Sequence, residues 1–232
     1  MQDIRSKAAA VTVQAGASAQ LLNPAGSRVL RDTYRLLAAT LAFSAVVAGM
    51  SAALKLPHPG LLLTLGGYFG LLFLTSYLRN SAWGLLSVFG LTGFMGYTLG
   101  PIIAAYLSMP GGADIVTTAM GSTAVIFLAL SWYAKREDAV DMSRFGSFLM
   151  VGILTAFCLA LAAYFLQLPG LALAVSGLFV LLMSGMIMYQ TQAIVRVGED
   201  NYIMATVTLF VTIYNLFTSL LHLLGVFGSD EG

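Results

Sequence analysis

The sequence predicts an all-α integral membrane protein built as a bundle of seven transmembrane helices, and three observations lead to this prediction. Hydrophobic residues make up 59% of the chain and charged residues only 9%, whereas about a quarter of the residues of a soluble domain are charged. Seven apolar, uncharged runs are each long enough to cross roughly 30 Å of hydrocarbon as a helix. Ten of the eleven Lys and Arg residues fall in the N-terminal segment and in alternate connections between these runs.

The apolar runs are expected to be helices, because a chain in hydrocarbon must pair every backbone N–H and C=O internally and a helix does so within one segment. The connections between the runs are short, so no extramembrane domain fits between two spans. The predicted spans are residues 36–54, 61–78, 83–107, 115–134, 145–166, 171–195 and 202–227.

The basic residues also predict an orientation, because Lys and Arg in short loops near span ends stay on the cytoplasmic side. The N-terminus is therefore expected in the cytoplasm, and an odd number of spans places the C-terminus on the opposite side, where Lys55 is the one basic residue. Aromatic side chains favour the headgroup region. Six of them fall at the predicted inner ends: Tyr34, Tyr77, Trp83, Trp132, Tyr133 and Tyr202.

Composition divides the chain into three regions. Residues 1–27 are expected to form a flexible cytoplasmic tail, since Ala, Ser, Gln and Gly dominate there. Residues 28–228 form the seven-helix membrane domain, and residues 229–232 a short external C-terminus. The net charge of +1 offers no basic surface for nucleic acid. The single cysteine, Cys158, excludes an internal disulfide.

The seventh run carries polar residues that recur every three or four positions, which places them on one face of a helix. Hydrocarbon cannot solvate this face, so it is expected to point into the bundle. Two interpretations stay open: the side chains hydrogen-bond to neighbouring helices, or they line a hydrated path for ions. The residues of this polar face are Thr208, Thr212, Asn215, Ser219 and His222.

Few ionisable residues lie near the polar face in the sequence. Glu199 and Asp200 precede the seventh run and are expected at its cytoplasmic mouth. The core of every predicted span lacks Asp, Glu, Lys and Arg, which argues against a proton pump or an ion-driven carrier. The sequence has no His-Glu-x-x-His motif and only two histidines, so we expect no metal site, no cofactor and no enzymatic activity.

Glycine and proline positions predict close helix contacts and one irregular helix. Gly66 and Gly70, and likewise Gly96 and Gly100, are spaced so that two helices can approach closely. Pro101 follows Gly100 within the third run and lacks a backbone donor, so it is expected to kink that helix.

Several segments, together and in the same order, resemble the Bax inhibitor-1 (transmembrane Bax-inhibitor-motif) family over residues 28–228. The segments are VLRDTYRLLA at residues 29–38, LTGFMGYTLGPI at 91–102, GEDNYI at 198–203 and IYNLF at 213–217. The resemblance implies a seven-helix bundle in which the last helix is central, surrounded by the other six.

Members of that family that act as calcium leaks carry two aspartates, on the sixth and seventh spans, that form a pH-sensitive latch. The matching positions in this sequence are Gln190 and Thr212. Neither residue ionises, so the resemblance implies the bundle without the pH-gated form of the leak.

The similarity is strongest to a proteobacterial branch associated with the membrane-anchored protease FtsH and its HflK–HflC companions. This resemblance implies a protein of the bacterial inner membrane that binds FtsH and limits the degradation of other proteins, as a slow substrate or competitor. A calcium or cation leak is the alternative function. The N-terminal tail and the packed bundle suit the first role, since the tail offers a grip and the bundle resists extraction.

Overall fold

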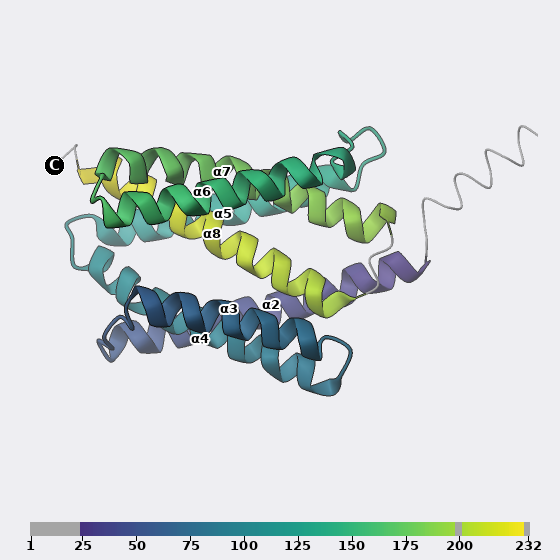
Figure 1. Cartoon of the computed structure of the whole chain (residues 1–232), viewed down its shortest axis with the longest axis horizontal. Helices are drawn as coiled ribbons and strands as arrows, with labels where there is room; N and C mark the ends of the chain where they lie inside the picture. The colour runs from purple at the N-terminus through teal and green to yellow at the C-terminus, as the bar shows by residue number, and fades with distance from the viewer. Residues whose placement is uncertain (1–23, 198–200, 230–232) are drawn as a thin grey trace, which may run out of the picture.

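The computed structural model describes residues 24–197 and 201–229, which form long helices and no strand (Figure 1). Two short irregular helices accompany the long ones: a 3-10 turn, η1, before α6 and a π-helix, η2, after α7. The elements are α2 (Pro24–Ala53), α3 (Leu61–Leu78), α4 (Ala82–Leu107), α5 (Gly112–Ala134), η1 (Ser143–Phe145), α6 (Gly146–Phe165), α7 (Pro169–Gln192), η2 (Ala193–Val197) and α8 (Tyr202–Ser229).

The seven predicted spans are confirmed, because each coincides with a helix that is long and apolar enough to cross a membrane. Two boundaries differ. Helix α2 begins at Pro24 rather than near Leu36, since proline is favoured in the first helical turn, where its missing N–H costs nothing. The sixth span leaves α-helical geometry after Gln192 and ends as η2. The predicted tail lies mostly outside the described residues, as do Glu199 and Asp200.

The long helices form two groups with α8 between them (Figure 1). In one group α2 and α3 both pack against α4, and in the other α5 and α6 both pack against α7. Helix α8 runs obliquely between the groups (Figure 1) and packs extensively against α2, α4, α5 and α7. The expectation that all six other helices surround the last one is therefore not confirmed, because α3 and α6 lie on the outer sides of α4 and α7.

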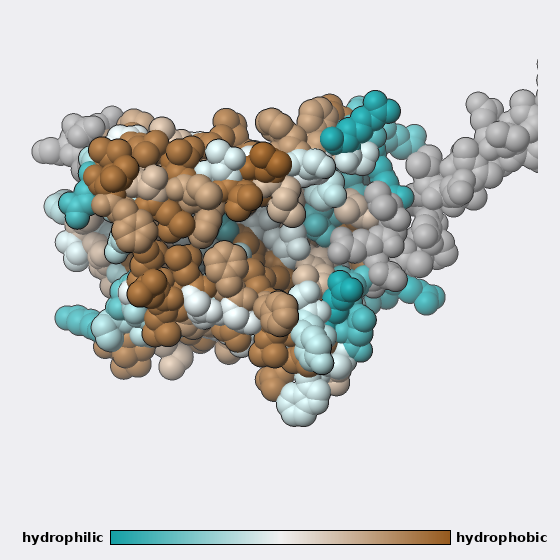
Figure 2. Space-filling model, in the orientation of Figure 1, coloured by the Kyte–Doolittle hydropathy of each residue, from teal (hydrophilic) through white to brown (hydrophobic). Residues whose placement is uncertain are grey.

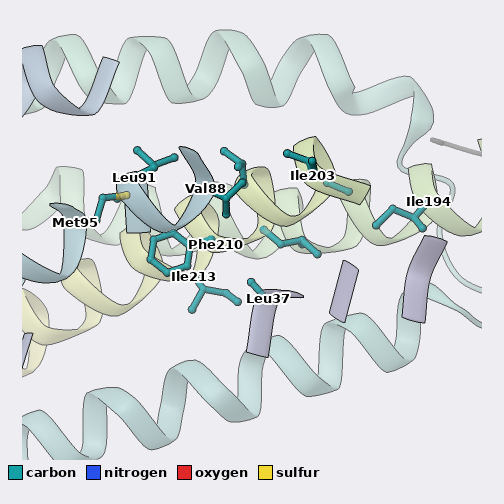
Figure 3. Packing of buried hydrophobic residues seen from close by; sticks show 11 residues of the cluster. Leu37, Val88, Leu91, Met95, Ile194, Ile203, Phe210 and Ile213 are labelled. Atoms are coloured by element: carbon teal, nitrogen blue, oxygen red, sulfur yellow. The ribbon is translucent and has the colours of Figure 1, made fainter. Parts of the chain in front are cut away.

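Helix α8 contributes to three separate clusters of buried apolar residues. Phe210 lies in a cluster with Leu37 of α2 and Leu91 and Met95 of α4 (Figure 3). Leu221 joins a second cluster formed mainly by α4 and α5, and Leu216 a third formed mainly by α6 and α7. Lipid tails are as apolar as these side chains, so close packing rather than exclusion of water holds the helices together here.

The contact between α2 and α4 depends on two of the predicted small residues. A Cβ added at Gly96 would lie 2.5 Å from the backbone oxygen of Ser44, and one at Gly100 would lie 2.4 Å from the Ser51 Cβ. A larger residue at either position would force the helices apart. The other predicted pair behaves differently, since a Cβ at Gly66 or Gly70 would meet nothing within 4 Å.

The described Lys and Arg residues other than Lys55 gather at one end of the bundle, which we call the basic end. Figure 2 shows an apolar surface along the helices with hydrophilic residues at the ends. Lys55, in the turn after α2, lies at the opposite end. The residues of the basic end are Arg28, Arg31, Arg35, Arg79, Lys135, Arg136, Arg144 and Arg196.

Candidate functional site at the last helix

The predicted polar face of α8 is turned into the bundle along most of its length. Thr212 is 2% exposed and Ser219 is 7% exposed, while Thr208, Asn215 and His222 are half-buried. The face divides into two parts with different surroundings, a packed part nearer the basic end and a part that borders a cavity.

The cavity lies between α6, α7 and α8 near the end opposite the basic end, and its volume is about 640 Å³. We call it the α6–α8 cavity. Asn215, Ser219 and His222 line it from α8, and Ser176 lines it from α7. A polar wall of this kind can hold water. The other two residues of the polar face, Thr208 and Thr212, do not line the cavity.

Hydrogen bonds of the polar face are mostly local. The Thr212 hydroxyl donates to the carbonyl of Thr208 (2.7 Å), and the Asn215 amide donates to the carbonyl of Val211 (2.8 Å). These bonds satisfy the polar groups within α8 itself and tie it to no neighbour.

One bond does join two helices. His222 Nδ1 lies 2.8 Å from Ser176 Oγ of α7. The Ser176 hydroxyl donates to the carbonyl of Ala172 (3.0 Å), so the tautomer that satisfies both contacts has His222 as the donor to Ser176. Sequence reasoning missed Ser176, because a single serine in an apolar run carries no pattern.

The packed part of α8 separates the cavity from the basic end. Leu209, Phe210 and Leu216 are each no more than 1% exposed. Gln190 and Thr212, the positions at which the family resemblance implied the latch, are also buried, at 5% and 2% exposure. A hydrated path along α8 would therefore require α8 to move relative to its neighbours.

At the basic end, Gln192 holds the connection between α5 and α6. Its side-chain oxygen accepts a hydrogen bond from the backbone N–H of Met142, and its amide donates to the carbonyl of Val140, each at 2.8 Å. Gln192 is only 3% exposed. In the π-helix that follows, the Arg196 guanidinium donates to the carbonyl of Arg136 at 2.7 Å.

The start of α8 is fastened in a similar way. The Asn201 side-chain oxygen accepts a hydrogen bond from the N–H of Met204 (3.1 Å), which caps the helix. The Asn201 amide donates to Asn80 Oδ1 in the α3–α4 turn (2.9 Å). Nothing in the sequence around Gln192 pointed to its partners, which lie some fifty residues away along the chain.

Pro101 lies within α4, and the helix continues through it to Leu107. Since proline has no N–H, the Tyr97 carbonyl lacks its usual donor four residues later. The Ser51 hydroxyl of α2 donates to that carbonyl instead, at 3.0 Å. Ser51 is 2% exposed, so this bond lies inside the bundle.

Within the described residues, no group of three or more His, Cys, Asp or Glu side chains could hold a metal ion. His58 lies in the exposed turn before α3, where its Nδ1 accepts a hydrogen bond from the N–H of Gly60 (3.0 Å).

Comparison with known proteins gives a consistent result. The family model described as inhibitor of apoptosis-promoting Bax1 matches residues 26–229. A protein of Escherichia coli K12 named modulator of FtsH protease YccA is 49% identical over 203 residues, which cover 88% of this chain and 92% of that protein. An uncharacterized protein of Pseudomonas aeruginosa is 52% identical over 205 residues, again 88% and 92% of the two chains.

The fold and the composition define a polytopic, all-α integral membrane protein whose seven spans carry a buried polar face on the last helix. The family match covers nearly the whole of the bundle. The chain belongs to the Bax inhibitor-1 family.

Proposed function

We propose that this protein resides in a bacterial inner membrane and modulates the membrane protease FtsH, as a regulator and not as an enzyme. The observation that carries the proposal is the 49% identity to the E. coli protein named for that activity, over 88% of this chain. A protein of another E. coli strain, also 49% identical over 203 residues, is named inner membrane protein YccA.

The charge distribution supports a cytoplasmic N-terminus. The basic end gathers every described Lys and Arg residue except Lys55, and such residues near span ends are retained in the cytoplasm. This orientation puts the N-terminal segment on the side where an ATP-dependent protease has its supply of ATP.

The hydrogen bonds of the basic end support the role of a slow substrate. A protease that pulls on the N-terminal segment applies force at this end first, to α2. There Gln192 and Arg196 bind the α5–α6 connection, and Asn201 binds the start of α8 to the α3–α4 turn. Each hydrogen bond that must break adds about 0.5 to 1.5 kcal/mol to local opening, and the exposed bonds of Arg196 and Asn201 fall at the lower end of this range.

The test is co-purification from inner membranes with FtsH made proteolytically inactive, in cells with and without HflK and HflC. We expect FtsH to be retained in both strains, and HflK–HflC to be retained only through FtsH. In cells with active FtsH, a high level of this protein should lengthen the lifetime of a second membrane substrate. Failure to retain FtsH, together with an unchanged lifetime of the second substrate, would overturn the proposal.

Removal of residues 1–23, which precede α2, separates binding from degradation. If this segment is the grip of the protease, the shortened protein should persist longer in cells with active FtsH while its bundle stays folded. An unchanged lifetime would exclude the segment from the mechanism and leave the rest of the proposal standing.

A calcium or cation leak is the second candidate, and the α6–α8 cavity is the observation that favours it. Asn215, Ser219 and His222 give that cavity a polar wall. Because Gln190 and Thr212 are neutral, this path lacks the coupled carboxyl pair that would gate a flux by titrating between about pH 6 and 8. Calcium flux into liposomes, with Asn215→Leu as the blocked variant, tests this. Steep pH dependence would show that other groups gate the path.

A further inference from the structure

A groove on the surface of the bundle lies between α2 and α5, close to the basic end, and its volume is about 350 Å³. Tyr34 and Leu41 line it from α2, and Leu128, Ser131 and Lys135 line it from α5. The two helices belong to different halves of the bundle, and each packs against α8. The groove is thus an open seam between the halves, on a surface that faces lipid.

The inner wall of the groove is closed by two aromatic rings. Tyr34 and Phe127 meet edge to face, with ring centroids 6.0 Å apart, and both pack against the buried cluster around Phe210. The outer rim is exposed: Leu128 is 65% and Trp132 is 63% exposed. A ligand would therefore enter from the membrane and lie against a rigid wall.

Two residues that line this groove carry a hydroxyl group without a protein partner. Five buried hydroxyls lack a hydrogen bond among the described residues, and two of these belong to Ser131 and Tyr34, whose oxygen atoms lie buried behind the groove surface. Ser131 is 4% exposed. Other helical hydroxyls here, such as Thr123, bond to the preceding turn, whereas Ser131 does not. A buried hydroxyl without a partner is costly, so a bound acceptor would stabilise both groups.

Two positively charged side chains, Lys135 and Arg31, lie near the basic end of the same groove. The Lys135 ammonium lies 4.8 Å from the centre of the Tyr34 ring. Arg31 precedes Tyr34 by one helical turn and falls on the same face of α2. Its nearest carboxylate contact, with Asp32, is 3.9 Å long and exposed, which makes it weak. Both cations are available to an anion.

The order of these groups along the groove identifies the ligand. Lys135 lies one turn, about 6 Å, beyond Ser131, and Leu128 lies one turn on the other side of Ser131. Charge, then hydroxyl donors, then apolar side chains follow one another from the basic end toward the membrane centre. A glycerophospholipid presents phosphate, ester carbonyls and acyl chain in the same order.

We propose that the groove between α2 and α5 binds one anionic glycerophospholipid from the leaflet at the basic end. The phosphate contacts Lys135 and Arg31, and an acyl chain lies between Leu41 and Leu128. The ester oxygens accept hydrogen bonds from Ser131 and Tyr34 once these side chains turn their buried hydroxyls toward the groove. Trp132 covers the rim at headgroup depth, where tryptophan is favoured.

The two tryptophans provide a matched test, since Trp83 is also at the basic end and is 66% exposed. With excitation selective for tryptophan, only Trp132 fluoresces in the Trp83→Phe protein and only Trp83 in the Trp132→Phe protein. Each is placed in bilayers that contain brominated phosphatidylglycerol or brominated phosphatidylcholine, and fluorescence quenching is measured. We expect the anionic lipid to be preferred roughly fivefold at Trp132, the effect of about one cation at a membrane surface, and not at Trp83.

Three variants in the Trp83→Phe background complete the test. Lys135→Gln and Arg31→Gln should each lower the preference at Trp132, whereas Arg144→Gln, which removes an exposed charge of the basic end outside the groove, should leave it unchanged. An equal preference at both tryptophans would show general surface attraction and overturn the proposal. Absence of quenching at Trp132 by either lipid would show that a second copy or another protein fills the groove, and would overturn it as well.

Discussion

At the scale of single residues, a side chain of one helix supplies a hydrogen bond that the backbone of another helix lacks. Pro101 leaves the Tyr97 carbonyl without its intrahelical donor, and Ser51 supplies a hydroxyl at 3.0 Å. Gly100 allows this contact, because a Cβ there would collide with Ser51. Water cannot replace the bond inside a membrane, so Ser51, Gly100 and Pro101 act as one unit.

This unit predicts a non-additive effect on stability. Ser51→Ala should lower the free energy of unfolding in detergent by about 1 to 2 kcal/mol, because a buried carbonyl loses its donor. In a Pro101→Ala background the new backbone N–H can reach the Tyr97 carbonyl, so the same change should cost much less. Ser108→Ala, which removes an exposed serine hydroxyl, is the control and should stay within about 0.5 kcal/mol. Equal costs of Ser51→Ala in both backgrounds would contradict the assignment.

At the scale of elements, the change from α7 to the π-helix η2 sets the position of the polar groups at the basic end. Gln192 is the last residue of α7 and fixes the α5–α6 connection, and Arg196 fixes it again from η2. In that connection the N–H of Ser143 donates to Asp141 (3.0 Å) and lowers the pKa of this exposed carboxyl, with smaller contributions from the Ser143 side chain and nearby arginines. The connection is therefore ordered by these long-range bonds together with local turns.

Loss of the Gln192 side chain should loosen this connection. Gln192→Ala removes two hydrogen bonds, and a loss of about 1.4 kcal/mol corresponds to tenfold more frequent local opening. We expect amide hydrogen exchange in residues 138–145 to quicken by roughly tenfold, and degradation by FtsH to quicken with it. Ser147→Ala, an exposed change in the next helix, serves as the control. Faster exchange with unchanged degradation would separate this loop from the resistance to extraction.

At the scale of the whole molecule, two groups of helices meet only through a limited set of contacts, and α8 joins them. It packs against α2 and α4 on one side and α5 and α7 on the other. This arrangement leaves the groove between α2 and α5 on the surface and the α6–α8 cavity near the opposite end. Both openings follow from the oblique course of a single helix.

The charge asymmetry of the whole molecule predicts its orientation. A reporter that is active only in the cytoplasm should work when fused to the N-terminus and fail when fused after Gly228, because seven spans put the two ends on opposite sides. The physical reason is that ten of the eleven basic residues lie in the N-terminal segment and in alternate connections, and Lys and Arg near span ends are retained in the cytoplasm. Reporter activity at both ends would contradict the orientation.

Much of the fold was predictable from the sequence because hydrocarbon imposes strict rules. Each apolar run had to be a helix of a certain length, and all seven were found. The polar face of α8 was predictable as a face because its residues repeat with the helical period. Its division into a packed part and a part that lines the α6–α8 cavity was not, since that depends on where α6 and α7 end.

The amino-acid order was enough to predict the class of protein, the number and position of the spans, the gathering of charge at one end and the family. These properties depend on hydropathy, segment length and local motifs, so they can be inferred from each segment without knowledge of its neighbours in space. The polar pairs could be found only in the folded bundle: Ser51 with Tyr97, Ser176 with His222, and Gln192 with the α5–α6 connection. Such pairs depend on the rotation and depth of each helix, and these are set by close packing between segments far apart in the sequence.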